Sequence, residues 1–126
     1  MEIKLKLNDV LNINHTLKSI VDNTTLKVEP VFKFKLLGIL KNLENHVASF
    51  EIIRNEKIAE YGKKTDDGKI YIPEDDKDAL DKINRDLTAI IETVVSVNIE
   101  KLKVSDVFSQ GLSSEHLVAL YPIIEE

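Results

Sequence analysis

Acidic side chains gather between residues 66 and 78, and their types and spacing come nearest to those of a chemical site. The group comprises Asp66, Asp67, Glu74, Asp75, Asp76 and Asp78. Crowded carboxylates can bind a divalent cation or act as a general acid and base pair. The run lacks the alternating aspartates and the twelfth-position glutamate of an EF-hand loop. We therefore interpret it as a solvated turn, followed by acids that stabilise the positive end of a helix dipole.

The other residue types that carry enzyme chemistry stand apart from one another. His15, His46 and His116 lie on three different predicted elements, and none has a second histidine at the spacing of metal ligands. The chain has no cysteine, which excludes disulfides, thiol catalysis and cysteine metal sites. Its four glycines form no phosphate-binding loop. We therefore predict no catalytic, metal-binding or cofactor-binding residue, no cofactor, and a protein that is not an enzyme.

Composition favours one folded domain that binds neither nucleic acid nor a membrane. The 126 residues carry a formal net charge of −5, and 43% of them are hydrophobic, which fits a single domain over residues 1–126. An acidic chain is a poor match for nucleic acid, because phosphate binding needs a basic face. With four Phe, three Tyr and no Trp, little is left for base stacking or for a large interface anchor. No apolar run approaches the roughly 20 residues that span a bilayer.

Two stretches keep the apolar spacing of a coiled coil, and a short polar turn separates them. Pro30 suits a first helical position and Gly62 a helix end, which predicts a helix over residues 30–61. A second helix is predicted over residues 74–93, after a turn at Asp67-Gly68. Apolar residues recur at intervals of three and four at Leu36, Leu40, Leu43, Val47 and Phe50, and again at Leu80, Ile83, Leu87, Ile90 and Val94. The pattern predicts a long antiparallel helical hairpin in which Leu36–Phe50 packs against Leu80–Val94.

The flanking segments predict a small sheet and two shorter helices. Strict alternation of apolar residues and lysines predicts a strand over residues 2–7. A helix then runs to about Asp22, with Asn8 or Asp9 as its N-cap. Alternating β-branched residues over 95–104 predict a second strand of the same sheet, with extended chain up to Val107. Ser113 caps a short helix over residues 114–121. The predicted fold class is α+β, mainly α.

The two arms of the predicted hairpin are unequal. At 1.5 Å per residue the first helix is about 48 Å long, which exceeds its return arm. Part of its apolar stripe must therefore meet the N-terminal helix, the small sheet or a second subunit. A homodimer is one of these alternatives.

Most of the chain resembles a group of small phage and prophage proteins. The features that carry the resemblance are Glu51-Ile-Ile-Arg-Asn-Glu-Lys-Ile-Ala-Glu-Tyr-Gly62, Asp67-Gly68, the alternating stretch from Val95 to Val107, Leu112-Ser113-Ser114-Glu115-His116-Leu117, and the tail Tyr121-Pro-Ile-Ile-Glu-Glu126. The resemblance covers about residues 28 to 126, and Phe32, Phe34 and Gly38 depart from the group's more aliphatic start. It implies a phage or prophage origin and a place among virion-assembly or accessory genes. It supplies no catalytic residue.

The leading hypothesis is a non-enzymatic phage or prophage accessory protein that acts through protein–protein contacts. It would be a minor structural or assembly factor, located in the host cytoplasm or the virion, with a virion or host protein as partner. One alternative is an inhibitor or regulator that binds a host protein through the acidic Asp66–Asp78 surface. A second alternative is a metal-dependent enzyme that uses the same acidic turn.

Overall fold

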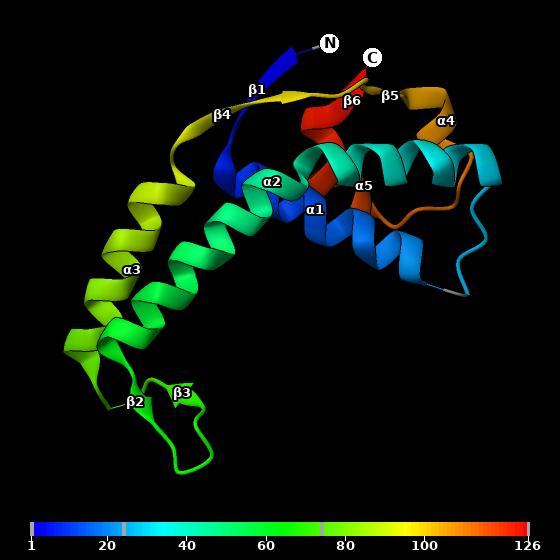
Figure 1. Cartoon of the computed structure of the whole chain (residues 1–126). Helices are drawn as coiled ribbons and strands as arrows, with labels where there is room; N and C mark the ends of the chain where they lie inside the picture. Colours follow the sequence, from blue (N-terminus) through cyan, green and yellow to red (C-terminus); the bar gives the residue numbers. More distant parts are fainter. Residues whose placement is uncertain (1, 24, 74, 126) are drawn as a thin grey trace.

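The computed structural model describes residues 2–23, 25–73 and 75–125, and these form a mainly helical α+β fold (Figure 1). The helices are α1 (Leu7–Asp22), α2 (Pro30–Tyr61), α3 (Lys77–Ile91), α4 (Val104–Phe108), α5 (Ser114–Leu120) and the 3₁₀ turn η1 (Tyr121–Ile123). The strands are β1 (Glu2–Lys6), β2 (Lys63–Lys64), β3 (Ile70–Tyr71), β4 (Val94–Asn98), β5 (Leu102–Lys103) and β6 (Ile124–Glu125). The strands pair in twos: β1 with β4, β2 with β3, and β5 with β6.

Helix α2 has the bounds that its sequence predicts. Pro30 occupies the start of the helix, where a missing N–H costs nothing. The N–H of Gly62 donates to Ile58 O at 2.7 Å and ends the helix. Gly62 has φ −87° and is extended, so a left-handed conformation is not the reason for a glycine. A Cβ there would lie 2.5 Å from Ile58 O and 2.9 Å from Tyr71 O, so lack of space is the reason.

The hydrophobic core lies between α1 and the first half of α2, which pack antiparallel. The fully buried side chains include Val10, Ile13, Leu17 and Ile20 of α1, and Leu36 and Leu43 of α2. The predicted packing of Leu36–Phe50 on Leu80–Val94 is therefore wrong in its first part. Leu36, Ile39 and Leu43 belong to the cluster formed with α1, β4 and the C-terminal elements. The partners of the long helix's stripe are these elements of the same chain.

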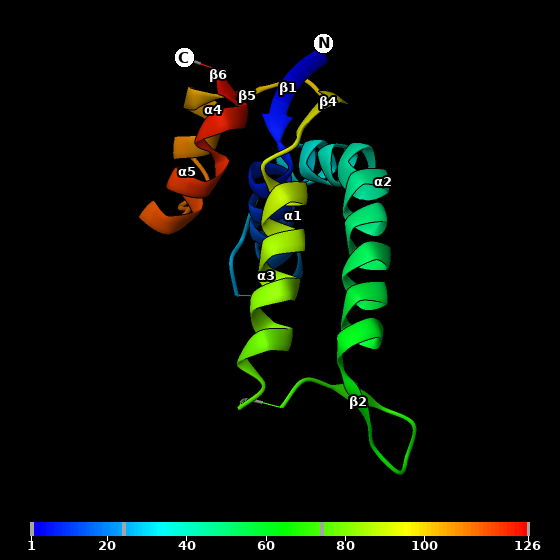
Figure 2. The same cartoon turned by 90° about the vertical axis from the view of Figure 1, so that its left-hand side faces the viewer.

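Helix α3 runs beside only the second half of α2 (Figures 1 and 2). Lys57 Nζ lies 3.5 Å from a carboxylate oxygen of Asp86, and Lys82 Nζ lies 5.9 Å from the ring centre of Tyr61. The helix begins at Lys77, later than the predicted residue 74, because the carboxylate of Asp76 accepts a hydrogen bond from the Ala79 N–H and acts as N-cap. Residue 74 itself lies outside the described residues. The helix ends at Ile91 because Val94 already pairs with β1.

The main sheet is the antiparallel pair β1–β4, with Ile3 opposite Val97 and Leu5 opposite Val95. Two side chains of α2 hydrogen-bond to the backbone of β4. Asn42 Nδ2 donates to Asn98 O at 2.9 Å, and His46 Nε2 lies 3.1 Å from Ser96 O. Side chains of α2 therefore cover backbone carbonyl groups of β4, and they protect this strand from pairing with another chain.

Two predicted strand bounds are wrong. Leu7 is the first residue of α1, whose N-cap is Lys6 rather than Asn8 or Asp9, and no side chain caps it. Extended chain does not continue to Val107, because residues 104–108 form α4. Leu102 instead pairs in parallel with Ile124, a partner distant in sequence. At the C-terminus the cap is as predicted, since Ser113 Oγ accepts from the His116 N–H, but α5 ends at Leu120 and η1 follows.

No helix in the described segments is both long and apolar enough to cross a bilayer.

Candidate protein-binding surface

The acidic side chains between residues 66 and 78 do not assemble into one site. Asp66 and Asp67 lie on the exposed turn between β2 and β3, where Lys63, Lys64 and Lys69 balance their charge. Asp76 is occupied in capping α3. Glu74 lies outside the described residues. Within residues 2–23, 25–73 and 75–125, no group of three or more His, Asp or Glu side chains is placed to hold a metal ion.

Asp67 has a structural role in the β2–β3 turn. Its carboxylate accepts a hydrogen bond from the Thr65 hydroxyl and a longer one, at 3.4 Å, from the Lys69 N–H. These bonds, the first above all, lower the pKa of the Asp67 carboxyl group below its ordinary value. Gly68 follows with φ +87°, which is the left-handed conformation that the Asp-Gly pair predicts. The carboxylate thus organises a turn.

The three histidines lie on three different helices, as their sequence positions predict. His15 is exposed on α1, and His46 contacts β4 as described above. His116 is half-buried on α5, and its Nδ1 makes no hydrogen bond within the described part of the chain. None of the three lies in a group that could hold a metal ion among the described residues.

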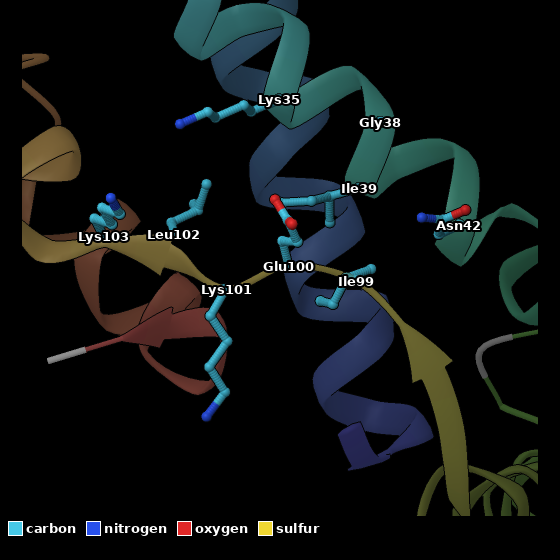
Figure 3. A pocket seen from close by; sticks show the side chains of 9 residues that line it. All are labelled: Lys35, Gly38, Ile39, Asn42, Ile99, Glu100, Lys101, Leu102 and Lys103. Carbon is cyan, nitrogen blue, oxygen red and sulfur yellow. The ribbon is translucent and has the colours of Figure 1, made fainter. Parts of the chain in front are cut away.

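A cavity of about 250 Å³, lined by charged as well as apolar side chains, lies between α2 and the segment that joins β4 to α4. Figure 3 shows the carboxylate of Glu100 turned toward α2, while the ammonium group of Lys101 points away from α2. Lys35 is paired with Asp106 at 3.6 Å. The lysines therefore do not converge on one point, as an anion site would require.

An apolar hollow of about 420 Å³ is formed by α4, α5, η1 and β6. Its lining consists of Val104, Val107, Phe108, Leu117, Tyr121 and Ile124. Phe108 and Tyr121 are each 68% exposed at its rim, while Val107 is buried. Exposed aromatic side chains beside an apolar hollow are typical of a surface that binds another protein.

The alternating pattern over residues 95–104 does not indicate this hollow, because it predicts extended chain up to Val107. The spacing of Val104, Val107 and Phe108, at three and four residues, is the helical signal that could have indicated α4. The few aromatic residues are not confined to the core. Four of the seven aromatic residues are exposed, namely Phe34, Tyr71, Phe108 and Tyr121. The chain thus places most of its large rings on its surface.

The outward face of α2 is a second exposed apolar surface. Phe34 is 77% exposed, Ile52 is 59% exposed, and Leu37 lies between them in sequence and is also exposed. Figure 2 shows α2 at one edge of the molecule, with α1, α3, α4 and α5 all on the same side of it. No other helix of the described chain therefore covers this face.

Comparison of the chain with protein-family models, with curated proteins and with solved structures finds no match in any of the three.

Proposed function

We propose that the chain is a non-enzymatic phage or prophage accessory protein that acts by binding another protein, as a minor structural or assembly factor. The observation that carries the proposal is the apolar hollow between α4 and α5, with Phe108 and Tyr121 exposed beside it. The phage assignment rests on the sequence resemblance described above. The proposed partner is a virion protein, and the proposed location is the virion or the host cytoplasm.

The hollow has the properties of a small hot spot. Its floor includes the buried Val107, so the site is supported by the core and is not merely a mobile surface. Phe108 and Tyr121 would bury large ring surfaces on binding, and aromatic residues carry a large share of interface energy. The proposed binding segment is accordingly an apolar stretch of the partner that inserts between these two rings.

Affinity capture with the double variant Phe108→Ala/Tyr121→Ala tests the proposal. The bait is used on lysate from cells producing the phage, and the recovered virion protein is then purified and titrated. Loss of the two rings should weaken its binding at least about 30-fold, because hot-spot truncations cost about 2 kcal/mol or more. Tyr71→Ala is the matched control, since it removes an exposed ring on β3 that does not line the hollow and should leave binding unchanged.

Two results would contradict the proposal. The first is equal binding of a virion protein by the wild type and the double variant, which would move the contact elsewhere. The second is turnover of a substrate by the purified protein that a single point change abolishes.

The alternative of a host-protein inhibitor with an acidic contact surface receives less support from the arrangement. Only one end of the Asp66–Asp78 surface is acidic in net charge, because residues 62–72 carry Lys63, Lys64 and Lys69 against Asp66 and Asp67, and the excess of acids lies in residues 74–78. Recovery of one host enzyme, with binding that is lost when Asp75 and Asp78 are replaced by Asn, would favour the alternative.

A further inference from the structure

The outward face of α2 carries exposed apolar residues in both halves of the helix, which we call the stripe. Phe34 and Leu37 lie in the first half, Lys41 interrupts the face, and Ala48, Ile52 and Ala59 lie in the second half. A helix with apolar residues on its solvent side as well as on its core side is typical of one that is covered on both sides. Beside the stripe, a hollow of about 340 Å³ lies between α1 and α2, and Lys41 and Ala48 are among the residues that line it.

Charge along this helix is segregated into two halves. Residues 30–43 contain three lysines and no acidic residue, whereas residues 44–61 contain four glutamates against Arg54 and Lys57. Lys57 is turned toward α3, where it pairs with Asp86. Lys35 pairs with Asp106 and Glu60 with Lys57, which leaves Lys33 and Lys41 in the first half, and Glu44, Glu51 and Glu56 against Arg54 in the second half. None of these six side chains forms an ion pair with another described residue.

From this pattern we infer that the occupant of the face is a second copy of the same chain, packed with its α2 antiparallel to the first. Antiparallel packing places the cationic half of each helix against the anionic half of its partner, so the same favourable contact occurs at both ends of the pair. It also brings Phe34 and Leu37 of one chain to the section between Ile52 and Ala59 of its partner. Parallel packing would instead set lysine against lysine and glutamate against glutamate, which is unfavourable.

The shape of α2 agrees with this arrangement. Figure 1 shows the helix changing direction midway, and Figure 2 shows that both halves stay at the same edge of the molecule. A two-fold axis along the bisector of such a bend places the first half of one helix over the second half of the other. The interface is then isologous, as in most homodimers. It leaves the hollow between α4 and α5 free, so the dimer and the proposed partner site are independent.

Charge reversal tests the inference. The variant Lys33→Glu/Lys41→Glu makes both halves of the outer face acidic, and Glu51→Lys/Glu56→Lys makes both halves basic. Sedimentation equilibrium at low salt should find the wild type dimeric, and each variant alone should dimerise at least about tenfold more weakly. An equimolar mixture of the two variants should regain wild-type association, because each acidic half again meets a basic half. Salt should weaken the wild type and the mixture alike.

A second test replaces one exposed apolar residue at a time, with a position on α5 as the matched control. Ile52→Glu places a charge in the stripe and should abolish the dimer, whereas Val118→Glu changes a still more exposed apolar residue of α5 and should leave the dimer intact. Circular dichroism confirms that each variant is folded. A wild type that is monomeric at all concentrations would overturn the inference. So would variants that associate as the wild type does, or a mixture no tighter than either variant. The hollow between α4 and α5 includes no residue of α2, so the absence of a dimer would not contradict the proposed partner site.

Discussion

Gly38 lies in the interior of α2 and Gly62 directly follows its last residue, and the two glycines have opposite surroundings. A Cβ at Gly38 would meet nothing within 4 Å, whereas at Gly62 it would meet backbone oxygens. Gly38 therefore weakens the helix although no neighbouring atom requires a glycine there. At position 62 the lack of space requires one.

Replacement of Gly38 by alanine should stabilise the protein by about 1 kcal/mol, because alanine loses less backbone freedom in a helix. Gly62→Ala should destabilise it by about 1–3 kcal/mol, since Ile58 O and Tyr71 O would have to move. Urea unfolding followed by circular dichroism measures both. A Gly38→Ala variant that is less stable than the wild type would show that the space beside α2 is needed in the folded chain.

The hydrogen bond from Thr65 to Asp67 should make the stability of the protein depend on pH. Because hydrogen bonds lower the pKa of Asp67 in the folded state, its contribution to stability is present above the ordinary aspartate pKa. The contribution is lost as the pH falls through the lowered value. Thr65→Val should return the Asp67 pKa toward its ordinary value, because the largest of these bonds is gone. A carboxyl titration by NMR measures this, and an unchanged midpoint would show that the hydroxyl bond does not set the pKa.

At the scale of elements, α2 serves two different partners along its length. Its first half completes the core with α1, and its second half forms a thinner pair with α3. Leu43 is fully buried in the first region, whereas Leu87 of α3 is only half-buried. The two leucines occupy equivalent places in the apolar spacing, yet their surroundings differ.

Leu43→Ala should therefore cost about 2–5 kcal/mol, as for other fully buried leucines. Leu87→Ala should cost clearly less, because solvent already reaches the site and a smaller cavity results. Denaturant unfolding of both variants measures the difference. Equal losses at the two positions would indicate that α3 is buried more deeply than its exposure in this structure implies.

The sequence predicted those elements whose ends carry their own chemistry. Pro30 and Gly62 mark α2, and Ser113 marks α5, because caps and stops act locally. Apolar spacing did not identify the partner of α2, since the same stripe suits α1 or α3. The pairing of β5 with β6 joins residues 22 apart (124 − 102), and no local pattern indicates it. The apolar periodicity predicts which face of α2 packs on the core. It does not predict that Phe34 and Ile52, on the opposite face, are exposed.

At the scale of the whole molecule, the chain exposes two apolar surfaces and no assembled cluster of metal-ligating groups within the described residues. One surface lies between α4 and α5, and the other follows α2. We propose that the first binds a partner protein and that the second joins two copies of the chain. A dimer of this kind would present two partner sites, so a bivalent target would bind more tightly than one site allows.

Because the chain has no cysteine, single introduced cysteines report directly on the antiparallel α2 contact. Phe34→Cys mixed with Ala59→Cys should form a mixed disulfide under mild oxidation, and Ala48→Cys, near the two-fold axis, should cross-link to itself. Phe34→Cys alone should cross-link no faster than Glu115→Cys, an exposed position on α5. Self-linked Phe34→Cys, with no mixed product, would contradict the account and indicate parallel packing instead.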